Sequence, residues 1–211
     1  MHIRAVIFDL DGTLIDSYRD IGIHLNRTLR DFGLEGVDVE KVRHMVGGGA
    51  RELLKRFFPN GLLEEALKVF RKYYLEEPVI HTRAFDGIER VLKEARERRI
   101  ALAVATNKME ELSRLILKRL GLYDYFSVVV GGDTFSEKKP SPLPLIEVLK
   151  RLGIPAEEAL MVGDTEADLT AGRLAGMKRA LAKWGYVRVE KETADYELES
   201  PEELISLFEK P

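Results

Sequence analysis

The sequence predicts an α/β protein with a doubly wound, mostly parallel sheet core and an inserted helical-bundle cap domain. Short apolar runs recur along the chain, and amphipathic helical patterns lie between most of them, which predicts the sheet with helices on both faces. Residues 16–81 carry helical stripes and no convincing strand, which predicts the insertion. We therefore expect a core of residues 1–15 and 82–211 and a helical cap of residues 16–81.

Five apolar runs predict the buried strands of this sheet. They are RAVIF before Asp9, ALAVA before Thr106, SVVVG before Gly132, ALMVG before Asp164 and RALA before Lys183. Parallel α/β sheets bind ligands outside the carboxyl ends of their strands, at the point where the strand order reverses. We therefore expect Asp9, Thr106 and Asp164 to lie together at one edge of the sheet.

Amphipathic helical patterns separate these runs. Apolar residues recur there at spacings of three or four positions, as on one face of a helix. Gly121, Gly153 and Gly176 follow three of the patterns and predict the ends of helices. The stripes are Ile88, Val91, Leu92 and Ala95; Leu112, Leu115, Ile116 and Leu120; Val148, Leu149 and Leu152; and Leu169, Leu174 and Ala175.

The inserted segment contains two longer stripes and two shorter helical patterns. The shorter ones lie around Glu40–Val46 and Arg51–Phe58. The apolar spacing of both longer stripes is that of helices packed together in a bundle. The longer stripes are Ile21, Leu25, Leu29 and Phe32, and Leu63, Leu67, Phe70 and Tyr74.

Composition excludes several classes of function. The chain has 211 residues, a net charge of -3 and no cysteine, so thiolate chemistry and disulfides are excluded and nothing favours nucleic acid as a partner. No apolar run approaches the roughly 20 residues of a membrane span, so no membrane is expected either. We find no signal-peptide pattern and expect a cytoplasmic protein, as a monomer or a homodimer.

Polar residues gather at the predicted strand ends. Several carboxylates that converge on one edge need a cation, because unpaired buried carboxylates are costly. Oxygen-only ligands suit Mg²⁺, and a hydroxyl, an amide and a lysine beside that ion suit a phosphate group. The residues at the strand ends are Asp9, Asp11, Thr106, Asn107, Lys138, Lys139, Asp164 and Asp168.

This constellation suits phosphoryl transfer. A phosphate dianion at about 4 Å from one carboxylate is repelled by roughly 8 kcal/mol at an effective dielectric near 20, which a divalent ion and a lysine more than offset. Asp9 would attack phosphorus and form an aspartyl-phosphate. Asp11 would protonate the leaving oxygen and later activate water. For the first of these roles Asp11 must be kept protonated, which is easier if Asp11 binds the metal through its backbone carbonyl and not through its side chain.

The motifs DLDGTL, the strand-end Thr106, KKPSP and VGDTEAD resemble, in order, the four motifs of the haloacid dehalogenase superfamily. The helical insertion resembles the cap of that family, and the resemblance spans nearly the whole chain. Within the superfamily, GGDTFSEKKPSPLPL and MVGGGARELL look most like phosphoglycolate phosphatases. The resemblance therefore implies a Mg²⁺-dependent phosphomonoester hydrolase whose partner is a small-molecule phosphate ester, 2-phosphoglycolate.

The resemblance also implies a role for each matching residue. Asp9 would be the nucleophile, Asp11 the acid and base, and Asp164 with Asp9 the Mg²⁺ ligands. Thr106 and Lys139 would bind phosphate, Lys139 being chosen over Lys138 because the family has a Lys-Pro step. Alternatively, Thr106 caps the helix expected near Lys108. Lys138 is expected to be a solvated neighbour, and Asp168 to lie in the second shell around Asp164 or to interact with a helix dipole.

The cap loop is the candidate for substrate recognition. Gly47, Gly48 and Gly49 let the backbone approach a ligand closely, and Arg51 is able to grip a carboxylate through two hydrogen bonds. Alternatively, the glycines form a flexible turn and Arg51 is an exposed helix charge.

The sequence is also compatible with other functions. A hydrolase of another small phosphate, such as a sugar phosphate or pyrophosphate, uses the same parts. A non-catalytic phospho-signalling module would be shorter, without a cap, and would carry its acceptor on a middle strand. A dehalogenase would not need Asp11, and a hexose-phosphate mutase resembling the family would carry a cap histidine where Ile21 stands.

Overall fold

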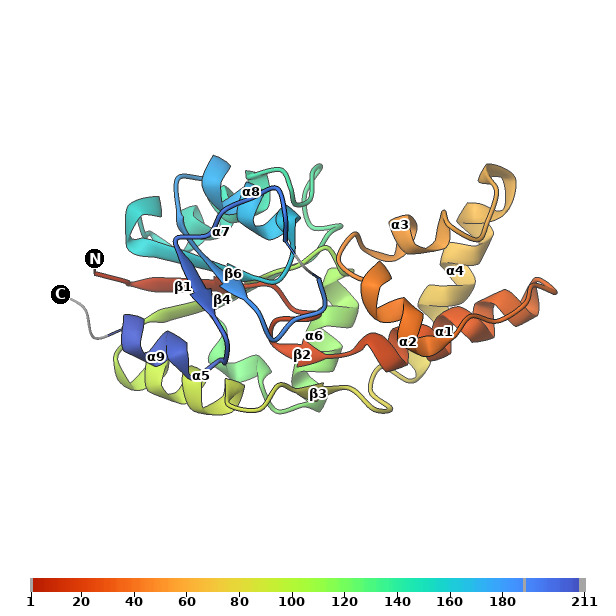
Figure 1. Cartoon of the computed structure of the whole chain (residues 1–211), viewed down its shortest axis with the longest axis horizontal. Coiled ribbons are helices and arrows are strands. Elements are labelled where there is room, and N and C mark those ends of the chain that lie inside the picture. Colours follow the sequence, from red (N-terminus) through yellow and green to blue (C-terminus); the bar gives the residue numbers. More distant parts are fainter. Residues whose placement is uncertain (1, 188, 209–211) are drawn as a thin grey trace.

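The computed structural model describes residues 2–187 and 189–208. Its core is a six-stranded parallel sheet of order β5-β4-β1-β6-β7-β8 (Figure 1). The strand order reverses between β1 and β6, as the predicted doubly wound fold requires. The strands are β1 (Ala5–Phe8), β4 (Ala101–Ala105), β5 (Val128–Val130), β6 (Ala159–Gly163), β7 (Lys178–Ala182) and β8 (Tyr196–Leu198).

Helices bury both faces of the sheet. Val6 and Phe8 belong to one apolar cluster, and Ala5 and Ile7, which point the other way, belong to a second. The first cluster includes helices α5 (Ile88–Glu97), α6 (Glu110–Arg119) and α9 (Glu203–Leu207). The second includes α7 (Leu143–Leu152) and α8 (Glu166–Leu174), on the opposite side of the sheet in Figure 1. This two-sided burial explains why the strands are apolar throughout.

The five predicted core strands are confirmed, and three others were not predicted. β8 extends the sheet beyond β7. β2 (Ile15–Asp16) pairs antiparallel with β3 (Arg83–Ala84), where the chain leaves the core and returns to it. The expectation of no strand within residues 16–81 is therefore wrong at Asp16. These strands are too short to show an alternating pattern in sequence.

Most helical stripes of the core are buried as predicted. The four residues of the α5 stripe are buried, and Gly121, Gly153 and Gly176 have positive φ at helix ends. In α8, however, Leu174 is 53% exposed. Ala171 and Gly172 are buried there instead, and a Cβ on Gly172 would lie 3.1 Å from the Met161 side chain. Small residues face the sheet because α8 packs very close to β6.

The helices between β2 and β3 pack on one another beyond the carboxyl ends of the core strands (Figure 1). Helix α1 contacts α2 and α4, and α3 contacts α4. The α4 stripe of Leu63, Leu67, Phe70 and Tyr74 is buried as predicted. These elements are α1 (Tyr18–Asp31), α2 (Val39–Val42), the 3₁₀ turn η1 (Arg43–Met45), α3 (Ala50–Leu54) and α4 (Asn60–Glu76).

Asp20 ties together the two chain segments that join these helices to the core. Its Oδ2 accepts hydrogen bonds from the backbone of Ile80 and Thr82, both at 2.9 Å, and from Thr82 Oγ1 at 2.6 Å. Its Oδ1 accepts one from His81 N at 2.8 Å. Burial raises the pKa of Asp20, but these hydrogen bonds outweigh it and hold the pKa below its ordinary value.

None of the helices in the described part of the chain is both long and apolar enough to cross a lipid bilayer.

Candidate active site

Asp9 lies where β1 ends, at the reversal of strand order. Its backbone N–H donates to Val162 O of β6 at 2.9 Å, which continues the sheet ladder and fixes the side chain at this edge. The side chain is nearly buried, and its Oδ1 accepts a hydrogen bond from Lys139 Nζ at 2.7 Å. Asp9 and Lys139 are therefore brought together as the sequence predicts.

Asp9 belongs to a cluster of three buried carboxylates beside this lysine. Oxygen atoms of Asp9, Asp164 and Asp168 lie within 4.8 Å of one another. Lys139 Nζ also donates to Asp168 Oδ1 at 2.5 Å. One ammonium group does not balance three carboxylates away from water, so the cluster favours an additional cation.

The protonation equilibria reflect this excess of negative charge. The pKa of Asp9 is raised to about 7: burial is the largest cause, Lys139 opposes it, and the charges of Asp168 and Asp11 add to it. Burial, followed by Asp9 and Asp168, raises the pKa of Asp164 well above its ordinary value. A divalent cation would reverse these shifts. The all-oxygen donor set fits Mg²⁺, so the predicted metal suits the residues present.

Asp164 is fixed by close backbone contacts. Its Oδ2 accepts a hydrogen bond from Tyr186 N at 2.9 Å and its Oδ1 one from Thr13 Oγ1 at 3.2 Å. Gly12 has φ of 89°, and a Cβ there would lie 2.4 Å from Asp164 Oδ2. Only glycine allows the loop after β1 to approach Asp164 this closely.

Asp168 contacts the lysine and its own helix at the same time. Its Oδ2 accepts hydrogen bonds from Thr165 N at 3.0 Å and from Thr165 Oγ1 at 2.6 Å, in a capping box at the start of α8. Its Oδ1 holds Lys139. Asp168 therefore belongs to the carboxylate cluster, while both of its oxygens already serve as acceptors within the protein.

Asp11 faces a different partner, which the sequence did not predict. Both of its oxygens lie 3.0 Å from Lys108 Nζ, and Oδ1 also accepts from Ser17 Oγ at 2.5 Å. Lys108 is 8% exposed, and its ammonium lies 4.5 Å from the centre of the Tyr74 ring. The side chain of Asp11 lies outside the carboxylate cluster. The one signal in the sequence is that Lys108 closely follows a strand-end threonine.

Thr106 and Asn107 follow β4 as predicted. Thr106 is buried, and its Oγ1 accepts a hydrogen bond from Lys108 N at 3.2 Å. It does not cap α6, because that helix begins later and Asp133 Oδ1 accepts from Glu110 N at its start. The Asn107 amide donates to Gly47 O and Lys139 O, both at 3.0 Å. Its Oδ1 is buried and has no hydrogen-bond partner among the described residues.

The glycine loop of the cap lies against the core. Lys138 Nζ donates to Gly48 O at 2.8 Å, so Lys138 is not simply a solvated neighbour. Gly49 has φ of 81°, and a Cβ there would lie 2.7 Å from Asn107 O. This contact leaves no room for a larger residue. The carbonyl groups of the loop face core donors, which closes one side of the site.

Arg51 follows this loop but is already paired. Its guanidinium makes two hydrogen bonds to Glu64, at 2.5 and 3.0 Å. The Arg51 side chain remains 46% exposed. It therefore lies at the edge of the site with its charge balanced on the surface.

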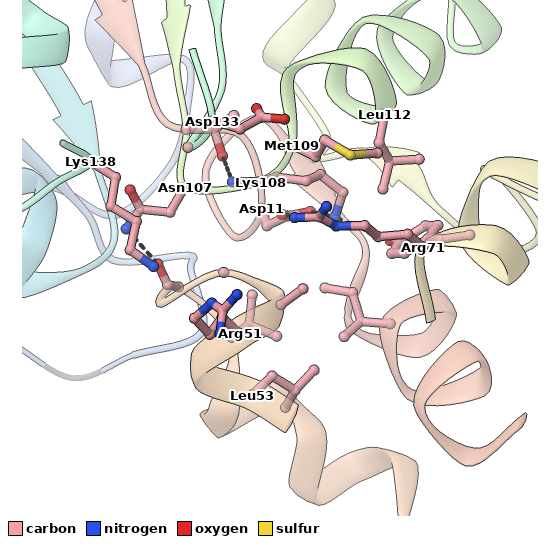
Figure 2. A pocket seen from close by; sticks show the side chains of 18 of the residues that line it. Asp11, Arg51, Leu53, Arg71, Asn107, Lys108, Met109, Leu112, Asp133 and Lys138 are labelled. Atoms are coloured by element: carbon pink, nitrogen blue, oxygen red, sulfur yellow. Dashed lines mark hydrogen bonds and ion pairs between the residues drawn. The ribbon is translucent and has the colours of Figure 1, made fainter. Parts of the chain in front are cut away.

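A pocket of about 350 Å³ lies between the cap and the core. Figure 2 shows Asp11 and Lys108 at its core side, with Arg71 extending into it from α4 and Arg51 on the cap. Apolar cap residues, including Val46, Leu53 and Phe70, form much of the opposite wall. The pocket thus opens onto Asp9 and Asp11 and is bounded by several cations, as a small anionic ligand requires.

Known proteins are similar to this chain in sequence and in fold. The family model described as haloacid dehalogenase-like hydrolase matches residues 6–182. The chain therefore belongs to the haloacid dehalogenase-like hydrolases. It is an enzyme of that family, a phosphatase, and the predicted resemblance is confirmed.

Its similarity to particular members is high. The chain is 47% identical over 206 residues to a phosphoglycolate phosphatase from Aquifex aeolicus (strain VF5), covering 98% of this chain and 97% of the relative. It is 37% identical over 215 residues to a phosphoglycolate phosphatase from Chromobacterium violaceum, with 98% and 97% covered. A solved structure described as a predicted phosphoglycolate phosphatase from Haemophilus somnus 129pt superposes with a TM-score of 0.91 at 25% identity, covering 98% of both chains.

Proposed function

We propose that the protein hydrolyses 2-phosphoglycolate with Mg²⁺, through an aspartyl-phosphate formed on Asp9. The observation that supports this most is the contact of Asp9 with Lys139 inside the buried cluster with Asp164 and Asp168. A carboxylate in such a cluster is held rigidly at a strand end, faces a pocket and is paired with a phosphate-binding cation. The names of the relatives support the choice of substrate.

The metal would be held by the side chains of Asp9 and Asp164 and by the backbone carbonyl of Asp11. When bound, Mg²⁺ supplies positive charge that offsets the repulsion between carboxylates and phosphate. Asp168 Oδ1 accepts a hydrogen bond from Lys139 at 2.5 Å, so we assign Asp168 the role of orienting Lys139.

In the first step, Asp9 attacks phosphorus. A bond forms between a carboxylate oxygen of Asp9 and phosphorus, and the bond from phosphorus to the ester oxygen breaks. Lys139 and Thr106 hold the remaining phosphate oxygens. Asn107 is also an expected phosphate ligand, although its amide donors are directed at Gly47 and Lys139 carbonyls here. Charge stabilisation and positioning suffice for this transfer.

Asp11 moves the protons. It gives its proton to the ester oxygen as the alcohol leaves, and then takes one from the water that hydrolyses the aspartyl-phosphate. Both steps return the enzyme to its starting state with phosphate and alcohol released. Ser17 and Lys108 contact its carboxyl group and fix its orientation at the pocket.

The helical insertion would select the substrate. The core groups recognise only phosphate, so the cap residues that line the pocket discriminate among leaving groups. The cap also excludes water, which strengthens the electrostatic interactions at Asp9. The glycine loop of residues 47–49 contributes by closing against Asn107 and Lys138.

A substrate panel with Mg²⁺ tests this function. We expect the highest kcat/KM for 2-phosphoglycolate among sugar phosphates, pyrophosphate and an aryl phosphate. Rapid quenching should trap phosphate on the wild-type chain, and Asp9→Asn should leave less than about a hundredth of wild-type kcat and no trapped phosphate, because an amide does not attack phosphorus. A higher kcat/KM for a sugar phosphate or pyrophosphate would assign that compound as the substrate in place of 2-phosphoglycolate. Absence of turnover on every compound would indicate a signalling module.

A further inference from the structure

We propose that Lys108 recognises the carboxylate of the leaving group, so that it is the specificity residue for a phosphate ester of a 2-hydroxy acid. This rests on the proposed function, because it takes Asp11 as the group that contacts the ester oxygen. The proposal stands on the position of the Lys108 ammonium beside Asp11 and on the other contacts of the pocket cations.

The substrate itself limits where its carboxylate is able to lie. In an ester of glycolate, two covalent bonds separate the ester oxygen from the carboxyl carbon. Covalent bonds of this kind are about 1.2–1.5 Å long, so the carboxylate oxygens lie within about 3–4 Å of the ester oxygen. The group that binds them must therefore be an immediate neighbour of the group that protonates the ester oxygen, which is Asp11.

Lys108 is such a neighbour. Its Nζ lies 3.0 Å from both oxygens of Asp11 and lines the same pocket. The side chain is 8% exposed, and Nζ lies 3.3 Å from Tyr74 Oη and 4.5 Å from the centre of that ring. An ammonium group has three donors, so it is able to keep Asp11 and accept a second carboxylate. Because packing already holds it in place, little conformational entropy is lost on binding.

The other cations of the site are less suitable. Lys139 is buried between Asp9 and Asp168, on the phosphate side. Lys138 holds Gly48 O, and Arg51 is paired with Glu64 at the surface. Arg71 extends into the pocket from α4 but is exposed (Figure 2). Among these residues, Lys108 alone joins burial to direct contact with Asp11.

The position of Lys108 predicts how selectivity depends on the length of the substrate. A carboxylate one carbon farther from the ester oxygen passes beyond Lys108, and an ester without a carboxylate leaves it with Asp11 alone. The wild-type kcat/KM should therefore fall from 2-phosphoglycolate to the phosphate ester of 3-hydroxypropionate and to ethyl phosphate. Equal values for 2-phosphoglycolate and the phosphate ester of 3-hydroxypropionate would overturn the proposal, because the carboxylate would then be recognised farther from Asp11.

The deciding experiment replaces Lys108 and measures a ratio. In Lys108→Met, which keeps a long apolar side chain against Tyr74, the ratio of kcat/KM for 2-phosphoglycolate over ethyl phosphate should fall about 10–100-fold. Lys108→Arg retains the charge and should recover part of that ratio. Arg71→Met, a matched loss of a cation from the same pocket, should change the ratio less than about 3-fold.

The outcomes separate this proposal from the proposed function. A wild-type enzyme without preference for 2-phosphoglycolate over ethyl phosphate would contradict the proposed substrate. A wild-type preference that survives in Lys108→Met and disappears in Arg71→Met would assign the carboxylate to Arg71 and overturn the proposal alone. If Lys108→Met does not fold, as judged by circular dichroism, Lys108→Arg is the deciding variant. In Lys108→Arg, an unchanged kcat/KM ratio of 2-phosphoglycolate over ethyl phosphate, together with an unchanged KM for 2-phosphoglycolate, would contradict direct contact between Lys108 and the substrate carboxylate.

Discussion

Lys138 of the core donates a hydrogen bond to the carbonyl of Gly48 in the cap, at 2.8 Å and across 90 residues of sequence. Asn107 donates to the neighbouring Gly47 O at 3.0 Å. Both donors follow core strands, and both acceptors are backbone atoms of the loop that closes the pocket. These contacts join the cap to the core beside the site, so they hold the cap in the position seen here.

Loss of the Lys138 contact should weaken closure of the cap. In Lys138→Met, we expect KM for the substrate to rise about 3–10-fold, because one partly buried hydrogen bond to a charged group is lost. Hydrogen exchange of the amides in residues 46–50 should become faster, which a purely electrostatic effect on substrate binding would not cause. The matched control is Lys150→Met, whose lysine pairs with Glu147 on the surface of α7. Unchanged exchange in Lys138→Met would contradict a closing role for this contact.

The roles of Asp9 and Asp11, the two aspartates after β1, should be distinguishable by how activity depends on the leaving group of the substrate. In Asp11→Asn, Asp9 still attacks phosphorus, but the ester oxygen receives no proton. General acid–base assistance contributes about 10²–10⁴-fold. We expect a loss of that size for alkyl phosphates and a much smaller loss for aryl phosphates, whose leaving groups need no proton. Steady-state kinetics on a matched alkyl and aryl pair measure this, and equal losses on both would exclude Asp11 as the leaving-group acid.

The buried strands and the carboxylates could be predicted because each leaves a local pattern. A strand covered on both faces is apolar throughout, as Ala5–Phe8 is, and the residue that follows it lies at the binding edge. β8 is a short strand with an exposed Glu197 at the edge of the sheet, so its pattern resembles a loop. β5 is equally short but consists of three valines, so an apolar composition, and not length, decided whether the sequence indicated a strand.

The role of Lys108 could not be predicted for a different reason. Its partners are Asp11, 97 residues away, and Tyr74, 34 residues away. Only the packing of α4 over the end of β4 brings them together, and no local pattern encodes that packing. Similarly, Arg51 closely follows the glycine loop in sequence, but its pairing with Glu64 of α4 depends on how the cap helices pack. The core site follows from the order of strands, whereas the cap contacts follow from tertiary structure.

The metal should be detectable through stability as well as activity. Without a cation, burial and the charges of Asp9 and Asp168 raise the pKa of Asp164, so the folded state binds more protons than the unfolded state. The contribution of Asp164 to the stability of the metal-free protein therefore falls as pH rises above about 4, which is the pKa of this group in the unfolded state. In EDTA at pH 7.5, Asp164→Asn should have a Tm equal to or above that of the wild type.

Added Mg²⁺ should reverse that order. A ligand at about 100 times its Kd stabilises the folded state by about 2.7 kcal/mol. The wild-type Tm should then rise by roughly 5–10 °C, since about 1 kcal/mol shifts Tm by 2–4 °C at this size. Asp164→Asn should respond much less, and EDTA should abolish hydrolysis in the wild type. A wild type that keeps full activity in EDTA, or shows no Tm response to Mg²⁺, would contradict the metal site.

Asp20 should stabilise the junction between cap and core in a pH-dependent way. Its carboxylate accepts hydrogen bonds from three consecutive backbone N–H groups and from Thr82 Oγ1, and these outweigh burial to lower its pKa. Since the folded-state pKa lies below the unfolded value of about 3.9, this stabilisation is complete above that pH and is lost as pH falls through the folded value. Asp20→Asn should lower the free energy of unfolding at pH 7 by about 2–3 kcal/mol. In the variant, the side-chain NH₂ group would face backbone donors that a carboxylate oxygen accepts from in the wild type.

Urea denaturation from pH 7 downward measures both the loss and its pH dependence. The difference between wild type and Asp20→Asn should stay constant to about pH 5 and shrink below about pH 4, while both proteins remain folded. Hydrogen exchange of the Ile80, His81 and Thr82 amides should accelerate in the variant, because these are the groups that lose their acceptor. The control, Asp31→Asn, neutralises an exposed carboxylate that accepts a hydrogen bond from the Tyr73 hydroxyl, and it should change stability by less than about 0.5 kcal/mol. A constant difference down to the lowest pH would mean that Asp20 acts through packing, with its charge contributing nothing.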